Sequence, residues 1–536
     1  MSDKASERTA SQKRAAHPDF VETFSLAAIC NRLPIRLLAP EGTPPSPKRH
    51  YRSEHRYLGL EDLAQPRTLA TLTLFEVVLR LVDFAPLRDY LAQFCYVVSA
   101  KGQVRFDPAS LFLCVCLRRE LQCGWLSLAK LLAGEHGAEW RRLFGFQEGV
   151  TPSASGLRFF FHRLGPELCE EINCLLIDAL HTAGFLPDRS TFPGDPPDRG
   201  VSLSHDLMLH DARSNMRCAY VTDTCYQPAP RPCPAKEAKK EGCDCSTDDC
   251  AQACRRTTPQ DPEARYIHYE GRNKKGDLLS SGAARGRDVY GYASAPDRLL
   301  DDRLACAWTL RTGGLYPANS DERKLFPASF ARLQARFRWL KIGEVLADAA
   351  LGFQDCLDPI WQAGALRMVD IRASKEDGHP DLQVRRGYDE NGHPLCTHGY
   401  KMRSNGHDYR RRQTKWCCEK TCRDDAEHAV PDCPYLKENH QHGQVVNVGR
   451  TLPGGCVRLA REVPYGSDLW KKRYGQRNLS ESRNGTLEGK GLKRPPSFGL
   501  KGCHREVALG DFLDNLRTLS RLVSEATVLA NKRQVG

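Results

Sequence analysis

Two short apolar segments of the chain each run directly into an aspartate. V-S-L-S-H precedes Asp206, and E-V-L-A precedes Asp348, which is followed by a turn and an amphipathic helix. Strands that alternate with loops and helices predict an α/β fold. In open α/β sheets, ligands bind beyond the carboxyl ends of the strands. We therefore expect both carboxylates at one ligand-binding edge of a sheet.

The whole chain divides into segments that differ in composition and in hydrophobic periodicity. Its 536 residues exceed what one hydrophobic core usually organises. The segments expected are a disordered basic arm over 1–65, a helical N-terminal domain over 66–190, the first part of an α/β domain over 200–370 with a Cys-rich insertion at 225–262, a basic Cys-rich insertion over 371–465, and C-terminal helices over 466–536.

Capping signals mark the helices of the N-terminal domain. Asp107 precedes a proline and predicts a helix start, and Gly134 closes L-S-L-A-K-L-L-A. A further helix begins near Thr151 or Ser153 after a short turn. This layout is compatible with the second helix of a helix-turn-helix, in which Arg158 would contact DNA. A plain bundle helix is the alternative.

Positive charge is concentrated near the C-terminal end. The formal net charge is +12, and residues 396–505 hold 22 Lys and Arg against 11 Asp and Glu. Such a local excess favours a polyanionic partner. No apolar run of about eighteen residues spans a bilayer, and the polar start lacks the apolar region of a secretory signal. We expect a soluble protein that stays in the compartment where it is made and has no membrane partner.

The segment Y-G-Q-R-N-L-S-E-S-R-N-G-T-L-E-G-K places a phenol, a guanidinium and two carboxylates on one helix face. Tyr474, Arg477, Glu481 and Glu488 follow one another at offsets of three, four and seven, which brings them within roughly 60° on a helix. Metal-dependent phosphoryl transfer requires carboxylates beside cationic donors. The alternative is an ordinary solvated helix with an i,i+4 pair.

The strand-end and helix positions would allow three acidic residues to lie close together. Asp206 and Asp348 at strand ends and Glu481 on the helix could together hold two Mg²⁺ ions about 3.5–4 Å apart. A strand-end aspartate is also often a helix N-cap. Asp211 and Asp223 are alternatives for the first position.

The order of these motifs resembles that of DDE-type insertion-sequence transposases with a Tyr-x2-Arg-x3-Glu-x6-Lys signature. Tyr474, Arg477 and Glu481 match the signature spacing. H-D-L-M-L-H-D-A-R-S resembles the block around the first family aspartate, which favours Asp206 over Asp211, and L-A-D-A-A-L-G resembles the block around the second. G-L-Y-P-A-N-S-D-E-R-K-L resembles the segment between the two aspartates, and residues 68–164 resemble the N-terminal domain. The likeness covers roughly residues 68–520.

The resemblance implies an RNase H-like mixed sheet with flanking helices and a transposase that cleaves DNA in the bacterial cytoplasm, associated with the nucleoid. Asp206, Asp348 and Glu481 would bind Mg²⁺, while Tyr474 and Arg477 would grip a phosphate of the transposon end. The exposed 3′ hydroxyl would then attack target DNA. The partners implied are double-stranded DNA, as terminal inverted repeats and target, and further copies of the chain in a homodimer or larger DNA complex.

Two positions depart from the family pattern. Glu488 stands where the signature has lysine, and Lys490 follows two residues later as the alternative DNA contact. Leu207 and Met208 replace a usual Gly-Thr. These departures keep open a catalytically inactive DNA-binding derivative, domesticated or acting as a repressor. A zinc-stabilised nuclease is the third hypothesis.

Two cysteine clusters could bind metal. Tetrahedral zinc takes four thiolate or imidazole ligands, and the candidates in the second cluster are Cys396, Cys417, Cys422 and Cys433, with Cys418 to spare. The first cluster is less regular: Cys225, Cys233, Cys243, Cys245, Cys250 and Cys254. Reduced thiols are the alternative in both, because a large chain without an export signal is not expected to rely on disulfides.

Overall fold

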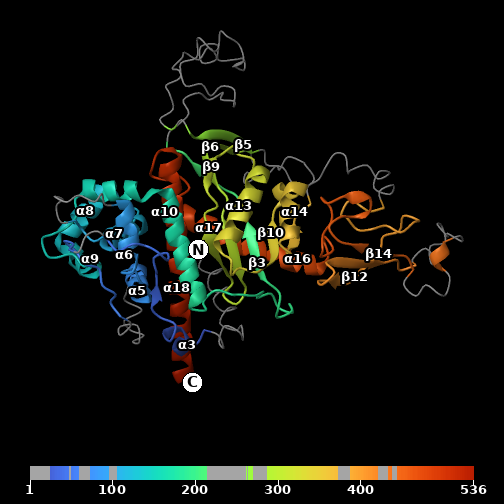
Figure 1. Ribbon diagram of the computed structural model, residues 1–536, viewed down its shortest axis with the longest axis horizontal. Helices are drawn as coiled ribbons and strands as arrows, with labels where there is room; N and C mark the ends of the chain where they lie inside the picture. The colour runs from blue at the N-terminus through green and yellow to red at the C-terminus, as the bar shows by residue number, and fades with distance from the viewer. Residues whose placement is uncertain are drawn as a thin grey trace, which may run out of the picture.

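The computed structural model describes residues 24–46, 50–59, 73–95, 105–213, 261, 263–269, 287–371, 387–420, 433–436 and 443–535. Helices and several sheets together form a mixed α/β protein, which confirms the expected class. Figure 1 shows the N-terminal helices on one side, α10 and α18 in the middle, the central sheet beside them and a small sheet at the far side. Within the described part of the chain, no helix is long and apolar enough to cross a membrane.

The N-terminal part is mainly helical, as expected. Its elements are α5 (Leu74–Leu81), α6 (Leu87–Cys95), α7 (Pro108–Glu120), α8 (Trp125–Ala133), η2 (Glu135–Gly137), α9 (Ala138–Phe144) and α10 (Ala154–Thr182). The predicted caps are present: Asp107 and Ser153 each accept a hydrogen bond from a first-turn amide, and Gly134 ends α8. A kink interrupts α10 at Gly165, where φ is 72°.

The disorder expected for residues 1–65 is wrong for residues 24–46 and 50–59. They contain α3 (Leu26–Cys30) and β1 (Ile35–Arg36), which pairs in parallel with β2 (Val82–Asp83). Four of their apolar side chains are buried in the main core: Phe24, Ile29, Ile35 and Leu37. The Pro- and Arg-rich composition of this segment does not indicate order for these few apolar residues, because their order depends on tertiary packing.

The central sheet has five strands. They are β3 (Val201–His205), β7 (Asp297–Asp301), β8 (Cys306–Arg311), β10 (Ile342–Ala347) and β11 (Leu366–Val369). Their order is β11-β10-β3-β7-β8; β10 runs parallel to β3 and β11, and β7 runs antiparallel to β3 and β8. The helices α13 (Glu322–Arg336) and α14 (Gln354–Gln362) precede β10 and β11. In chain order, the first strand of this sheet is β3 and the fourth is β10. The first strand therefore lies at the centre, beside the fourth.

Two smaller sheets flank this one. In the first, β6 (Arg287–Ser294) pairs antiparallel with β4 (Met208–Asp211), β5 (Arg265–Tyr269) and β9 (Leu315–Pro317). The second holds β12 (Arg403–Asp408), β13 (Gln413–Cys417) and β14 (Val445–Val448), all antiparallel, with the short turns η7 (Pro434–Leu436) and η8 (Pro453–Gly455) nearby. It lies in the segment expected to be an insertion and has its own buried cluster around Trp416.

The C-terminal part is helical, as expected. It comprises α16 (Asp468–Tyr474), η9 (Gly475–Arg477), α17 (Asn478–Gly489) and α18 (Gly499–Val535). Between α16 and α17 the backbone keeps right-handed helical angles through Tyr474, Arg477 and Asn478. The predicted signature therefore lies on a nearly continuous helical segment.

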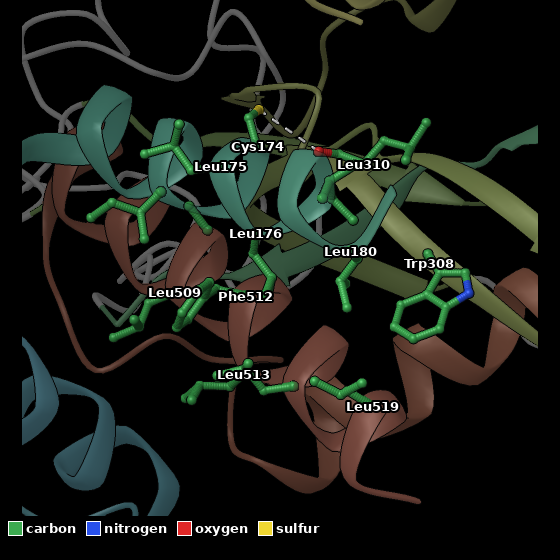
Figure 2. Close-up of a cluster of buried hydrophobic side chains, with 14 of the residues drawn as sticks. Cys174, Leu175, Leu176, Leu180, Trp308, Leu310, Leu509, Phe512, Leu513 and Leu519 are labelled. Atoms are coloured by element: carbon green, nitrogen blue, oxygen red, sulfur yellow. Dashed lines mark hydrogen bonds between the residues drawn. The ribbon is translucent and has the colours of Figure 1, made fainter. Parts of the chain in front are cut away.

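One core joins the N-terminal helices to the central sheet, with α18 between them. Figure 2 shows Phe512 and Leu513 of α18 beside Leu176 of α10 and Trp308 of β8. These residues belong to one buried cluster that also includes α5 and α7. Burial of such side chains stabilises by about 1.5–3 kcal/mol each, so α18 fixes the helical part against the sheet.

Buried polar pairs also hold α18 in register. Asn515 accepts from the Thr309 amide at 2.9 Å and donates to Asn173 at 2.8 Å. Arg483 of α17 forms a bidentate pair with Asp511 at 2.6 and 2.9 Å, and both side chains are fully buried. Charge-assisted bidentate pairs are the stronger and more directional hydrogen bonds. The α17 helix is thereby anchored to the core.

Candidate active site

Asp206 and Asp348 follow neighbouring parallel strands. β3 ends at His205 and β10 ends at Ala347. Ser204 is paired with Leu346, so the register, continued by two residues, brings Asp206 alongside Asp348. Adjacent strands lie about 4.8 Å apart. The two aspartates expected at one edge of the sheet therefore do lie at the same edge.

Arg477 connects this edge with the C-terminal helices. Its Nη2 donates to Asp206 Oδ1 at 2.9 Å, and its Nη1 lies 3.9 Å from Glu481 Oε1. Burial alone would lower the pKa of Arg477, but the charges of Asp206, Tyr474 and Asp348 raise it. Asn484 adds a longer contact of 3.5 Å to the other oxygen of Asp206. One face of the segment from η9 to α17 thus faces the strand-end carboxylates.

Glu322 is a fourth carboxylate of this cluster that the sequence interpretation missed. It lies in the first turn of α13, with a side chain that is 13% exposed. Burial raises the pKa of Glu322 to about 7; His205 and Arg477 oppose the rise, whereas Asp348 and Asp206 add to it. Glu322 lies within G-L-Y-P-A-N-S-D-E-R-K-L, the segment that resembles the one between the two family aspartates. An acidic residue in a first helical turn is also common for reasons of helix stability alone, so its role was not singled out.

His205 supports the same edge from the end of β3. Its Nδ1 lies 3.0 Å from Asp297 Oδ1 and its Nε2 lies 3.9 Å from Glu322 Oε1. Burial would lower the pKa of His205, but the hydrogen bond and charge of Asp297 outweigh burial and raise it. The imidazole of His205 therefore takes up a proton more readily than a free histidine, and when protonated it balances part of the charge of the acidic group.

Asp348 has two environments at once. Its Oδ1 accepts a hydrogen bond of 2.7 Å from the Ala350 amide and caps the short η5 turn (Ala349–Leu351). The prediction that this strand-end aspartate caps a helical turn is therefore confirmed. Its charge also acts on Arg477, Tyr474 and Glu322, so the cap leaves the residue within the acidic cluster.

Tyr474 lies half-buried beside this cluster. Its ring stacks on Trp470 with centroids 4.4 Å apart and an interplanar angle of 14°. Burial, followed by the charge of Asp370, raises the pKa of Tyr474 well above its usual value. The phenol therefore stays protonated at neutral pH and can serve as a hydrogen-bond donor.

Glu481 points towards solvent on α17, with a side chain that is 56% exposed. Among the described residues, no three His, Cys, Asp or Glu side chains are grouped closely enough to hold a metal ion. The structure brings Asp206 and Asp348 together, and it is Arg477 that contacts Asp206. Glu481 reaches the group only through its long contact with Arg477.

The remaining predicted residues lie elsewhere. Lys490 at the end of α17 pairs with Glu120 Oε1 at 2.7 Å, and Arg158 on α10 contacts His162 at 3.4 Å. Asp211 lies on β4, in the smaller sheet that contains β6, and Asp223 lies outside the described residues. Neither Lys490 nor Arg158 contacts the strand-end carboxylates.

The cysteine clusters are described only in part. Cys396, Cys417 and Cys433 are free thiols, and the fourth predicted ligand, Cys422, lies outside the described residues. Cys396 and Cys418 are buried in the cluster around Trp416. The first cysteine cluster also lies outside the described residues. Zinc binding therefore stays a prediction.

No family model, curated protein or solved structure matches this chain.

Proposed function

We propose that this protein is a DNA transposase that cleaves the ends of its own element and joins them to target DNA in a Mg²⁺-dependent reaction. The observation that carries the proposal is the meeting of Asp206 and Asp348, at the ends of adjacent parallel strands, with Arg477 on the signature helix. The ordered motifs that resemble DDE-type transposases supply the reaction class. The substrate is double-stranded DNA, bound by a homodimer or larger assembly at the bacterial nucleoid.

The sheet supports an RNase H-like interpretation of the catalytic domain. Its first strand is central, with antiparallel second and third strands on one side and parallel fourth and fifth strands on the other. Helices precede the last two strands. Such a mixed sheet with flanking helices puts two carboxylates at the edge where ligands bind.

The donor set fits Mg²⁺, which prefers carboxylate oxygens. The pKa of Glu322 is raised first by burial, and the charges of Asp348 and Asp206 at this edge add to the rise. Asp206 and Asp348 would hold the ion, and the exposed side chain of Glu481 would have to turn towards them from α17 to complete the site. The bound ion would supply activation of a water or 3′ hydroxyl and stabilisation of the leaving oxygen.

Arg477 and Tyr474 have roles of their own in this proposal. Arg477 exchanges its contact with Asp206 for a DNA phosphate, because a guanidinium binds phosphate and carboxylate with the same fork of donors. Tyr474, protonated at neutral pH, donates to that phosphate. Both residues position the DNA and leave proton transfer to other groups.

The test is strand transfer with DNA that carries the sequences flanking the coding region. Asp348→Asn keeps a side chain that can cap a helix but loses the charge, so end binding should persist and cleavage should be lost. Asp211→Asn on β4 is the matched control and should cleave like the parent protein. A well-folded parent protein that binds ends without cleaving them, whatever the divalent ion, would contradict the proposal.

A DNA-binding protein without catalysis is the second candidate. It is favoured by Glu488 at the signature lysine position and by Lys490, whose Nζ pairs with Glu120. The same assay separates the two candidates, because this one predicts end binding that is indifferent to Asp348→Asn and no strand transfer in any variant.

A further inference from the structure

A cavity of about 480 Å³ lies where the end of α7 meets the loop that follows α17. Four arginines line it, Arg118 and Arg119 from α7 and Arg213 and Arg494 from later segments. Phe498 is also in the lining and is 51% exposed. The cavity is separate from the strand-end carboxylates described above.

The described lining of the cavity is positively charged. The residues that the structure describes there include four arginines and no Asp or Glu. Glu506 is buried behind Arg118 and Arg119 and accepts from both, at 2.7 and 3.5 Å. Two guanidinium groups, each only about one-twentieth exposed, therefore share one carboxylate as ion-pair partner.

Several donors of these two arginines have no acceptor. Nε and Nη1 of Arg118 and Nε of Arg119 are buried and make no hydrogen bond within the described part of the chain. Buried polar groups are nearly always hydrogen-bonded, and leaving one unpaired is destabilising. Burial and the neighbouring charge of Arg119 lower the pKa of Arg118, whereas Glu506 opposes the shift. An anion in the cavity would offset the like charges of Arg118 and Arg119.

We propose that this cavity binds a phosphate group, and that under the proposed function the group belongs to the DNA backbone. Arginine forks match phosphate oxygens in geometry and charge, and an exposed aromatic ring such as Phe498 can stack on a base. The cavity lies near Gly489 at the end of α17, eight residues beyond Glu481. Eight helical residues span about 12 Å, which equals three to four nucleotides at about 3.4 Å each.

Two variants test the cavity without touching the carboxylate cluster. Gln122→Glu places a negative charge in the lining beside the arginines with almost no change of shape. Arg494→Gln removes an exposed positive charge from the same lining. Arg403→Gln on β12 is the control, because Arg403 is a 71% exposed arginine outside the cavity. Thermal unfolding verifies that each variant is folded.

The probes are inorganic phosphate, followed by calorimetry, and duplex DNA with the element ends, followed by fluorescence anisotropy over a series of salt concentrations. Both variants should lose phosphate binding. Their affinity for DNA should fall about tenfold, and the slope of log affinity against log salt should fall by about one. The Arg403→Gln control should keep full phosphate binding.

Two other results overturn parts of the proposal. Phosphate binding that the variants lose while DNA affinity stays unchanged assigns the cavity to a free phosphate compound and refutes the backbone contact. Variants that retain both activities refute the phosphate site. Failure of the transposase proposal looks different, because the parent protein would then bind phosphate in the cavity but cleave no DNA.

Discussion

The guanidinium of Arg477 donates to the carboxylate of Asp206 across 2.9 Å, which ties the helical segment near the C-terminus to the end of the first strand of the central sheet. These residues are 271 positions apart in the chain. Their side chains are about one-fifth exposed, so the pair is open to a ligand yet partly shielded from solvent. A phosphate that approaches this edge meets Arg477 and the carboxylates together.

Replacement of Arg477 by Gln should weaken DNA binding more than it destabilises the fold. The pair with Asp206 is partly exposed and should contribute only about 1 kcal/mol to the free energy of unfolding. The loss of a phosphate contact should reduce end affinity about tenfold. Urea unfolding and anisotropy measure the two effects, with Arg56→Gln, at a 79% exposed arginine outside the basic C-terminal segment, as control. An unchanged end affinity would remove Arg477 from the DNA interface.

Asp511→Ala should destabilise the protein severely. It leaves Arg483 buried without its bidentate partner, and breaking a buried pair costs about 3–5 kcal/mol. Glu139→Ala breaks an ion pair with Arg142 whose members are at least half exposed, and it should cost at most about 1 kcal/mol. Equal midpoints of urea unfolding for the two variants would show that the Arg483–Asp511 pair does not anchor α17.

Glu322 should make stability depend on pH. Its folded-state pKa of about 7 exceeds the unfolded value of about 4.3, so the folded protein holds a proton that the unfolded chain has lost. This contribution is fully present below about pH 4.3 and is lost as pH rises through 7. Glu322→Gln should therefore unfold at higher urea than the parent protein at pH 8 and nearly alike at pH 4. A variant that is weaker than the parent at pH 8 would contradict the shift.

Local chemistry explains what the sequence predicted well. The helix starts at Asp107 and Ser153 and the end at Gly134 depend on hydrogen bonds within a few residues, so their signals are readable in sequence. Asp206 and Asp348 were also located correctly, because each follows a short apolar strand and parallel strands end at a common edge. The association of Arg477 with this edge could be anticipated from the signature spacing.

Tertiary context explains what the sequence did not predict. The ordering of Phe24 and Ile29 depends on a core built from distant helices, which a Pro- and Arg-rich composition conceals. The role of Glu322 depends on burial beside Asp348, and local patterns do not report burial. The arginine-lined cavity combines α7 with a loop about 370 residues later, so no sequence window contains it.

The most direct measurement is a double-mutant cycle on DNA-end cleavage with Asp206→Asn, Asp348→Asn and the double variant. If the two strand-end carboxylates act as one unit, each single change should abolish most of the cleavage rate and the double variant should be scarcely slower than either, as residues of one catalytic unit are strongly non-additive. If the rate losses of the two single variants multiply in the double variant, or if a single variant retains the parent rate, the result would contradict a shared site at the ends of β3 and β10.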